Sequence, residues 1–265
     1  MKEDYKIIGK VAKKREETPG YDVGTLSDIT LSEKTRRETN YVVDMQIALH
    51  LFEIGNSIED GEEQLVEASG IYFALEEALP NRLVVLYRHA KVLDALGRHD
   101  GALERLRKVV ERLEQKREPT PAKHWIRAAA PKVLGVVLWE EARRVRAASS
   151  GAGSREEIAL LTEAYAVTKQ AFTKRVGTDP TAPADRPSER AQAANNLLYY
   201  ALEMSDAKHA VGDSYRLPRE EVLEFLKEMG AEDPEALTDH RALDTARRAF
   251  SYMGDKDKAR TCAER

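Results

Sequence analysis

The chain has 265 residues, enough to bury a sizeable core either in one domain or in an elongated stack of helices. Hydrophobic residues make up 42%, charged residues 33% and aromatic residues only 6%, a balance that favours helices over sheets. The net charge of −4 is too near neutral to indicate binding to nucleic acid or a membrane surface. The only cysteine, Cys262, excludes an internal disulfide and a cysteine-rich metal site.

The first forty residues differ from the rest of the sequence. Tyr5–Val11 has the composition of a β-strand, and a polar stretch with a Thr-Pro-Gly turn at residues 18–20 follows it. Because one strand cannot stand alone, we expect it either to extend the sheet of another chain or to be the remnant of a truncated domain. Residues 1–31 are therefore assigned to a strand and coil extension, and residues 32–265 to a helical domain.

From Ser32 onward, apolar residues recur at helical spacing. A first helix is expected over Ser32–Ile54, ended by Gly55 and Asn56, and a second over Ser57–Leu79, stopped by a proline. Acidic residues gather near the start of the second helix, where the helix dipole favours carboxylates; they are Glu59, Asp60, Glu62 and Glu63.

The clearest pattern lies in Leu83–Val110. Its first half has apolar residues at Leu83, Leu86, Ala90, Leu93 and Leu96. Gly97 then closes that helix, and a second apolar stripe begins at Ala102. The spacing predicts two helices joined by a tight turn, with Asn81 as the N-cap of the first.

This stretch resembles a tetratricopeptide repeat, with small Ala90 at a close helix contact, Gly97 at the turn and small Ala102 early in the second helix. A weaker match covers residues 244–260, where the same relative places are taken by Phe250, Met253, Gly254 and Ala259. The resemblance implies a divergent α-solenoid of antiparallel helix pairs over residues 32–265. It also implies an interaction scaffold that holds a peptide or a partner helix in a concave groove.

The C-terminal half is also expected to be helical. One long helix is predicted over His124–Ala148, bent or restarted at Pro131, and a flexible loop follows it. Ser154 then caps a helix that extends to Val176, with Glu157 completing a capping box. The remaining helices are expected over Ser188–Ala210, Pro218–Met229, Asp239–Gly254 and from Asp257.

Three polar residues are candidates for binding a peptide: Asn195, Asn196 and Tyr199. Two adjacent asparagines lower the stability of a helix by about 1 kcal/mol together relative to alanine, which suggests that at least one of them has a specific role. The resemblance implies that one of them binds the backbone of an extended peptide from the inner helix of a repeat. The alternative is that a buried asparagine joins two helices by a hydrogen bond.

Arg82 and His89 are candidates for catalysis. Residues seven apart share a helix face, and this spacing resembles the motif of HEPN-family ribonucleases, in which the two side chains act on a phosphodiester. That family usually has a polar residue directly after the arginine, whereas Leu83 follows here. The alternative is that Arg82 is a surface residue and His89 packs between helices.

A further alternative is that the chain is the helical regulatory tail of a larger enzyme, for example a nucleotidyltransferase of the RelA/SpoT type, with residues 1–30 left from its catalytic domain. The six histidines are scattered and no phosphate-binding motif occurs, so neither a metal nor a cofactor is expected. The N-terminus lacks an apolar core of signal-peptide length, and the longest apolar runs are far shorter than a membrane span. We therefore expect a cytoplasmic protein whose partner is a protein or a peptide.

Overall fold

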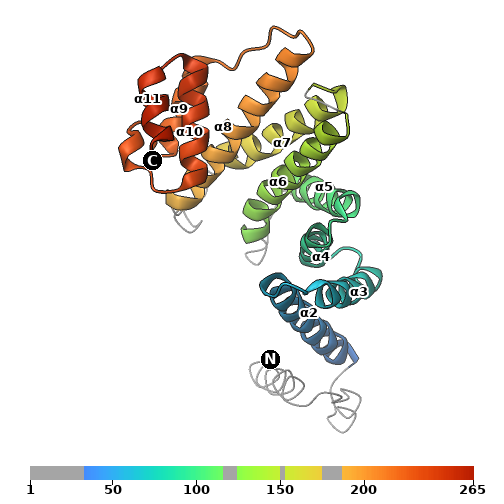
Figure 1. The fold of residues 1–265 in the computed structure, drawn as a ribbon. Helices are drawn as coiled ribbons and strands as arrows, with labels where there is room; N and C mark the ends of the chain where they lie inside the picture. Colours follow the sequence, from blue (N-terminus) through green and yellow to red (C-terminus); the bar gives the residue numbers. More distant parts are fainter. Residues whose placement is uncertain (1–32, 116–123, 150–152, 175–186) are drawn as a thin grey trace. The chain divides into compact units, whose positions relative to one another are not determined.

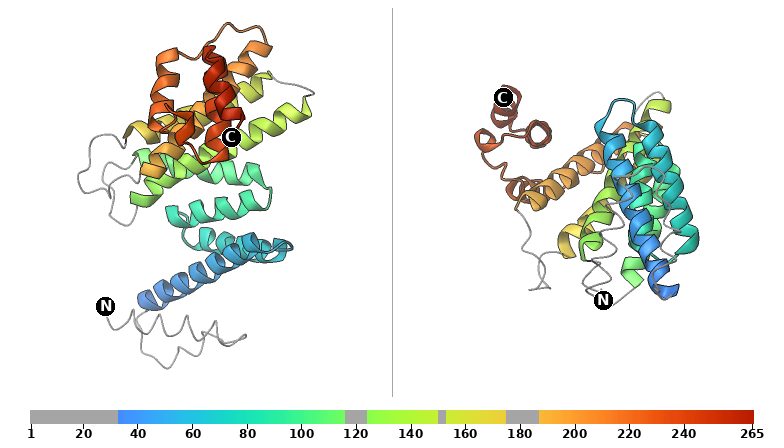
Figure 2. Two further views of the ribbon diagram at one scale, coloured as in Figure 1. Left: turned by 60° about the vertical axis from the view of Figure 1, so that its left-hand side comes forward. Right: turned by 90° about the horizontal axis from the view of Figure 1, so that it is seen from below.

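The computed structural model describes residues 33–115, 124–149, 153–174 and 187–265. These residues form ten α-helices and one short 3-10 turn, with no β-strand among them (Figure 1). Consecutive helices pack against one another, as Figure 2 shows from two further directions. The predicted all-α fold of successive helices is confirmed, while the predicted strand at Tyr5–Val11 lies outside the described residues.

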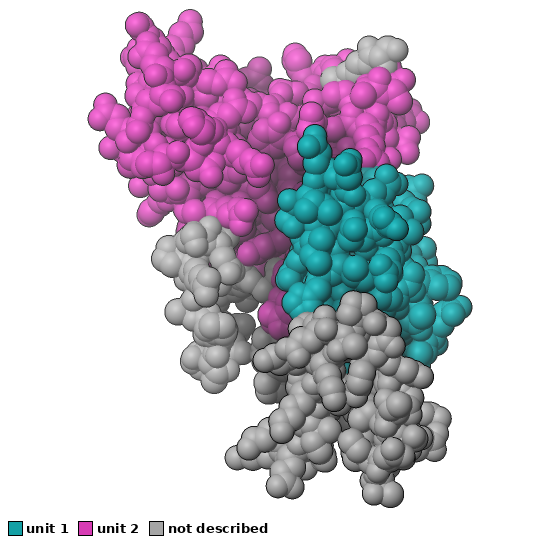
Figure 3. All heavy atoms as spheres, turned by 60° about the horizontal axis from the view of Figure 1, so that its bottom comes forward, with its two compact units in different colours: residues 1–105 teal, residues 106–265 magenta. Residues whose placement is uncertain are grey.

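The chain divides into two compact units, residues 1–105 and 106–265 (Figure 3). The described part of the first unit contains α2 (Glu33–Ser57), α3 (Glu62–Ala78), α4 (Leu83–Ala95) and the beginning of α5 (His99–Gln115). The second unit holds the rest of α5 and then α6 (His124–Ala148), α7 (Arg155–Lys174), α8 (Pro187–Ala210), α9 (Arg219–Glu228), α10 (His240–Met253) and α11 (Lys256–Ala263).

Four glycines end described helices with the same geometry: Gly97 after α4 and Gly254 after α10, and also Gly212 after α8 and Gly230 after α9. Gly97 has φ +70° and Gly254 has φ +80°, a left-handed conformation that a residue without a Cβ adopts at little cost. In these turns the next residue's N–H donates to the carbonyl five positions earlier, at 2.8 Å after α4 and at 2.9 Å after α10. This is the Schellman motif. The two stretches that resemble a tetratricopeptide repeat share this ending of their first helix, but α8 and α9 end in the same way, so the turn is not specific to those stretches.

The small residues predicted at close helix contacts are buried, since Ala90 and Ala102 expose no surface. The predicted cap of α4 is wrong, however. The N-cap is Arg82, and no side chain bonds to the free N–H groups there, so Asn81 does not serve as the cap.

The turn between α2 and α3 also departs from the sequence prediction. Gly55 was expected to end the first helix, but α2 continues to Ser57 and α3 begins only at Glu62. A Cβ added to either Gly55 or Gly61 would lie closer than 3.0 Å to backbone atoms of the other glycine. Gly55 is therefore required because two backbone segments meet at this point, and not because the helix stops there.

The second unit confirms several predicted boundaries. Helix α6 has the predicted limits and continues through Pro131. The Ser154 hydroxyl accepts a hydrogen bond from the Glu157 N–H at 3.0 Å, as in a capping box. The Glu157 carboxylate, however, accepts from the N–H of Gly153 at 2.8 Å, one residue before the position that a standard capping box uses.

Three helices of the second unit meet around Gly135 of α6. A Cβ at this position would lie closer than 3.0 Å to the Thr168 hydroxyl on α7 and 3.4 Å from the ring of Tyr200 on α8. Thr168 and Tyr200 are both buried. The missing side chain therefore lets α6 pack against α7 and α8 together, and it sets the spacing of the helices that carry the candidate site.

Candidate binding site

An aromatic pair joins α6 to α8 in the second unit. The rings of Trp139 and Tyr199 meet edge to face, with centroids 5.5 Å apart and planes at 86°. This geometry is favourable because the positive edge of one ring meets the negative face of the other. Both side chains are partly exposed, whereas the adjacent Tyr200 is buried beneath Trp139 with the ring centroids 6.5 Å apart.

Two arginines bracket this pair. The guanidinium carbon of Arg143 lies 5.0 Å from the Trp139 ring centroid, and that of Arg248 lies 4.9 Å from the Tyr199 ring centroid. Both distances are within the range of a cation–π interaction. Together Arg143, Trp139, Tyr199 and Arg248 form a row, called here the aromatic–arginine row. It crosses α6, α8 and α10, the first helices of the pairs α6–α7, α8–α9 and α10–α11.

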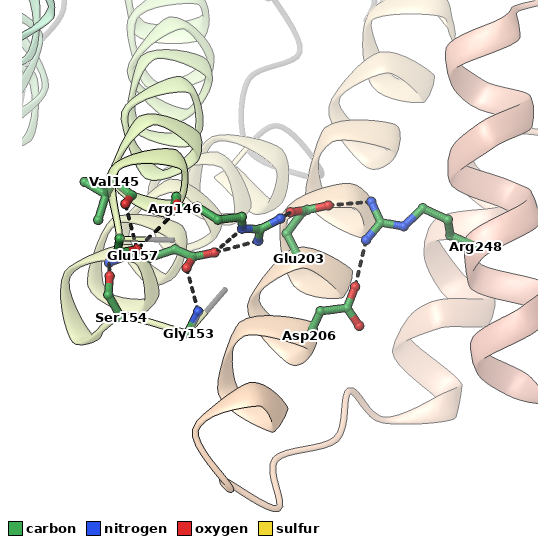
Figure 4. Close-up of polar contacts among 9 residues, drawn as sticks. Val145, Arg146, Gly153, Ser154, Glu157, Glu203, Asp206 and Arg248 are labelled. Atoms are coloured by element: carbon green, nitrogen blue, oxygen red, sulfur yellow. Dashed lines mark hydrogen bonds and ion pairs between the residues drawn. The ribbon is translucent and has the colours of Figure 1, made fainter. Parts of the chain in front are cut away.

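A network of ion pairs holds one end of the row in place (Figure 4). Arg248 binds Glu203 at 2.6 Å and Asp206 at 2.9 Å, both on α8. The other oxygen of Glu203 binds Arg146 of α6 at 2.7 Å. Because Glu203 bridges two arginines, the network fixes α8 between α6 and α10.

The network ends at a fully buried carboxylate. Glu157 of α7 is 0% exposed; it binds Arg146 at 2.6 Å, and its second oxygen accepts the Gly153 N–H. Burial alone would lower the pKa of Arg146, but the hydrogen bond that Arg146 donates to Glu157 and the charge of Glu203 outweigh it and raise that pKa. The pKa of Arg248 is raised in the same way, with Glu203 opposing the effect of burial. Both guanidiniums are therefore charged and paired, which suits them to positioning rather than to proton transfer.

The row offers a ligand three kinds of contact. Trp139 and Tyr199 are partly exposed and present ring surface, and Arg143 is an exposed residue that presents a guanidinium. Burial raises the pKa of Tyr199, and the Glu203 charge adds to this effect, so its hydroxyl stays protonated and can both donate and accept a hydrogen bond.

No protein-family model matches this sequence. No match to a curated protein is found either. Along the described helices, none combines the length and the apolar character that crossing a membrane requires.

The predicted peptide-binding residues all lie on α8, but they differ in their surroundings. Tyr199 belongs to the aromatic–arginine row, and Asn195 lies one turn before it on the same helix face. The side-chain oxygen of Asn195 is buried and has no hydrogen-bond partner among the described residues. Asn196 lies one turn before the buried Tyr200.

Sequence reasoning missed the other members of the row, which are Trp139, Arg143 and Arg248. A usable signal was present: Trp139, Arg143 and Arg146 follow one another at intervals of four and three residues, as do Tyr199, Glu203 and Asp206. Each set therefore occupies one helix face. Only the packing of α6 beside α8, however, brings the two faces together.

The residues of the ribonuclease hypothesis have different environments. Arg82 is exposed, and its guanidinium carbon lies 5.5 Å from the Tyr41 ring centroid. His89 is only 2% exposed. Its Nε2 lies 3.1 Å from the Ser69 hydroxyl, and its Nδ1 lies 2.8 Å from the Glu76 carboxylate. Both ring nitrogens of His89 therefore already have partners in the core.

Ser69, His89 and Glu76 are connected in the order of a serine-hydrolase triad, but the setting does not suit hydrolysis. Ser69 is buried within α3, where backbone N–H groups are used by the helix and cannot stabilise an oxyanion. Arg105 also binds Glu76, at 2.7 Å. Burial alone would raise the pKa of Glu76, but hydrogen bonds from His89 and Arg105 lower it overall. The cluster therefore ties α3, α4 and α5 together.

Proposed function

We propose that this protein is an interaction scaffold of the tetratricopeptide type, which binds a peptide or a partner helix on the face shared by α6, α8 and α10. The proposal rests on the aromatic–arginine row. Tryptophan, tyrosine and arginine are the residues that most often dominate binding energy at protein interfaces, because they combine large area with directed polar contacts. Here they come from the first helices of three successive pairs, the position from which the repeat family binds peptides.

The ion-pair network supports this proposal because it reduces the cost of binding. Immobilising a long side chain at an interface costs about 0.5–1.5 kcal/mol. Arg248 is already held by Glu203 and Asp206, and it lies over the Tyr199 ring. In this proposal Trp139 and Tyr199 supply the contact area, Arg143 pairs with an acidic or carbonyl group of the ligand, and Arg248 positions Tyr199.

The sequence provides an internal control for testing the proposal. Trp125 and Trp139 are the only tryptophans, both lie on α6, and Trp125 is 45% exposed without belonging to the row. A random peptide library is displayed against the full chain, and the selected peptides are synthesised and titrated. We expect Trp139→Ala and Arg143→Ala to weaken binding about tenfold or more, in line with an interface hot spot, and Trp125→Ala to leave it within about twofold.

Circular dichroism of each variant separates a lost contact from a lost fold. Arg143 is exposed, so its replacement should leave the helical spectrum and the melting temperature unchanged. Selected peptides that bind Trp139→Ala and Arg143→Ala as tightly as the original chain would remove the row from the binding site.

A further inference from the structure

The first unit contains a stretch of one-sided charge. Between Gly55 and Asn81 there is no lysine, arginine or histidine. The same stretch holds seven carboxylates: Glu59, Asp60, Glu62, Glu63, Glu67, Glu76 and Glu77. Its charge of −7 exceeds the −4 of the entire chain, so the remaining residues carry a net positive charge.

Six of these seven carboxylate residues are exposed to solvent. The seventh, Glu76, binds His89 and Arg105, as described above. Carboxylates in the first turn of α3 are explained by the helix dipole, but Glu67 and Glu77 lie beyond the first turn, where the dipole contributes little.

The same helix exposes large apolar side chains. Val66 is 45% exposed and Phe73 is 52% exposed, although both are in the middle of a well-packed helix. With Gly70 between them they follow the i, i+4, i+7 spacing of a single helix face, called here the α3 face. Of the seven exposed large hydrophobic residues in the described chain, four lie close together in sequence: Ile54, Ile58, Val66 and Phe73.

Gly70 at the centre of the α3 face has no role within its own unit. A Cβ added there would meet no heavy atom within 4 Å. Glycine in a helix interior is less favourable than alanine, so this position gives up stability without relieving any contact. The absent side chain leaves a notch between Val66 and Phe73, through which a second backbone can approach closely.

An ordinary solvent-facing helix of this chain shows the contrast. The exposed residues in the middle of α5 are Glu104, Arg107, Lys108 and Glu111. They mix both signs of charge, and no exposed large hydrophobic residue lies on that helix. The combination of exposed apolar residues, an open glycine and carboxylates without basic residues therefore distinguishes α3 from α5.

We infer that the α3 face is a docking surface for a basic amphipathic helix of a partner protein. The apolar side of such a helix would cover Val66 and Phe73, with its backbone over Gly70, while lysines or arginines beside it pair with the surrounding carboxylates. A second copy of the chain is a poor occupant, because two α3 faces would bring like charges together. This surface lies in the first unit and is independent of the aromatic–arginine row.

The test uses the full chain and two synthetic peptides of 18 residues. One has leucine on one helix face and lysine on the other, and its control has glutamate in place of lysine. We expect the leucine–lysine peptide to bind at least tenfold more tightly than the control, and its affinity to fall as salt rises from about 50 to about 500 mM, because screening weakens the pairing with carboxylates. Equal affinity for both peptides, or no binding of either, would overturn the inference.

Variants locate the binding on α3. Phe73→Ser should lower the affinity about tenfold, whereas Leu223→Ser, at a matched position 47% exposed on α9, should not change it. Gly70→Leu should fill the notch and weaken binding while raising the melting temperature, because leucine favours the helix. Unfolding of the variant cannot explain weaker binding that is accompanied by a higher melting temperature.

Two outcomes would decide against this inference. If Phe73→Ser and Gly70→Leu both bind the lysine peptide as the original chain does, the attraction is charge alone and the α3 face is not a docking surface. If sedimentation shows a dimer that Phe73→Ser abolishes, the occupant is a second copy. Trp139→Ala should leave this affinity unchanged, so failure here and failure of the proposed function are distinguishable.

Discussion

The two units each bury a set of charged side chains, but the two sets are organised differently. In the first unit a single carboxylate, Glu76, receives both His89 and Arg105 within α3, α4 and α5. In the second unit Glu203 bridges two arginines, and the chain of ion pairs joins four helices, α7, α6, α8 and α10. The first set closes a core, whereas the second reaches the surface at Tyr199.

This difference shows how similar chemistry can have two uses. A charge buried with all its partners beside it adds specificity to local packing and leaves nothing for a ligand. A charge network that continues to a half-exposed aromatic ring also fixes that ring, as Arg248 does for Tyr199. The cluster around Glu76 ends in the core and is therefore structural. The network around Glu203 ends at the partly exposed Tyr199 ring and therefore belongs to a candidate site.

The largest expected effect is that of Glu203→Ala. It leaves Arg146 without one carboxylate and Arg248 with only the exposed Asp206, and breaking a buried ion pair typically costs about 3–5 kcal/mol. Urea unfolding followed by tryptophan fluorescence reports on the second unit, which holds both tryptophans. Glu264→Ala, which removes an exposed pair with Arg260, is the control and should change stability by less than about 0.5 kcal/mol. Equal shifts for both variants would remove the network from the stabilising contacts.

Replacing a helical glycine with alanine should change the free energy of unfolding in opposite directions in the two units. Gly135→Ala inserts a methyl group against Thr168 and should lower the free energy of unfolding by about 1–3 kcal/mol. Gly70→Ala meets open space and should raise it by up to about 1 kcal/mol, because alanine favours the helix. Thermal unfolding followed by circular dichroism measures both changes. A destabilising Gly70→Ala would show that Gly70 is packed against another part of the chain.

The first unit should also lose stability in acid through Glu76. Its pKa is lowered in the folded state, so its contribution is complete above the unfolded value of about 4.3 and is lost as the pH falls through the folded value. Circular dichroism of urea unfolding between about pH 6 and pH 3 should show this loss, and Glu76→Gln should make the profile flatter. An unchanged slope in Glu76→Gln would contradict the role assigned to this carboxylate.

The smallest expected effect is that of Asn195→Ala. The Asn195 side-chain oxygen makes no hydrogen bond among the described residues, and alanine is the better helix former. The unfolding free energy should therefore change by less than about 1 kcal/mol. A larger loss would reveal a hydrogen bond that joins helices, whereas weaker peptide binding with unchanged stability would place Asn195 in the site.

Local signals in the sequence were sufficient for much of the fold. Gly97 and Gly254 were predicted to close helices because a left-handed turn favours glycine, and Ser154 was predicted to cap α7 because its hydroxyl can accept a backbone N–H. Each of these features depends on residues within one turn. Ala90 and Ala102 were predictable as buried residues because the helical period places them on apolar faces.

The candidate site was less accessible to such reasoning. Tyr199 was identified from the sequence. Glu203, Trp139 and Arg248 have nothing unusual in their local sequence, and the sequence alone does not show which helices become neighbours. Gly55 illustrates the same limit, because a glycine that ends a helix and a glycine that admits a second backbone look alike in sequence. Long-range packing separates the two cases.

The contact between Gly55 and Gly61 also constrains how this sequence can vary. A side chain at either position would strike the backbone at the other, so neither glycine can be exchanged alone without rebuilding the turn from α2 to α3. Related chains that keep this hairpin should therefore conserve two glycines six residues apart, at the beginning of the acidic stretch. This pair of glycines can therefore identify distant relatives even where the pattern of apolar residues is no longer similar.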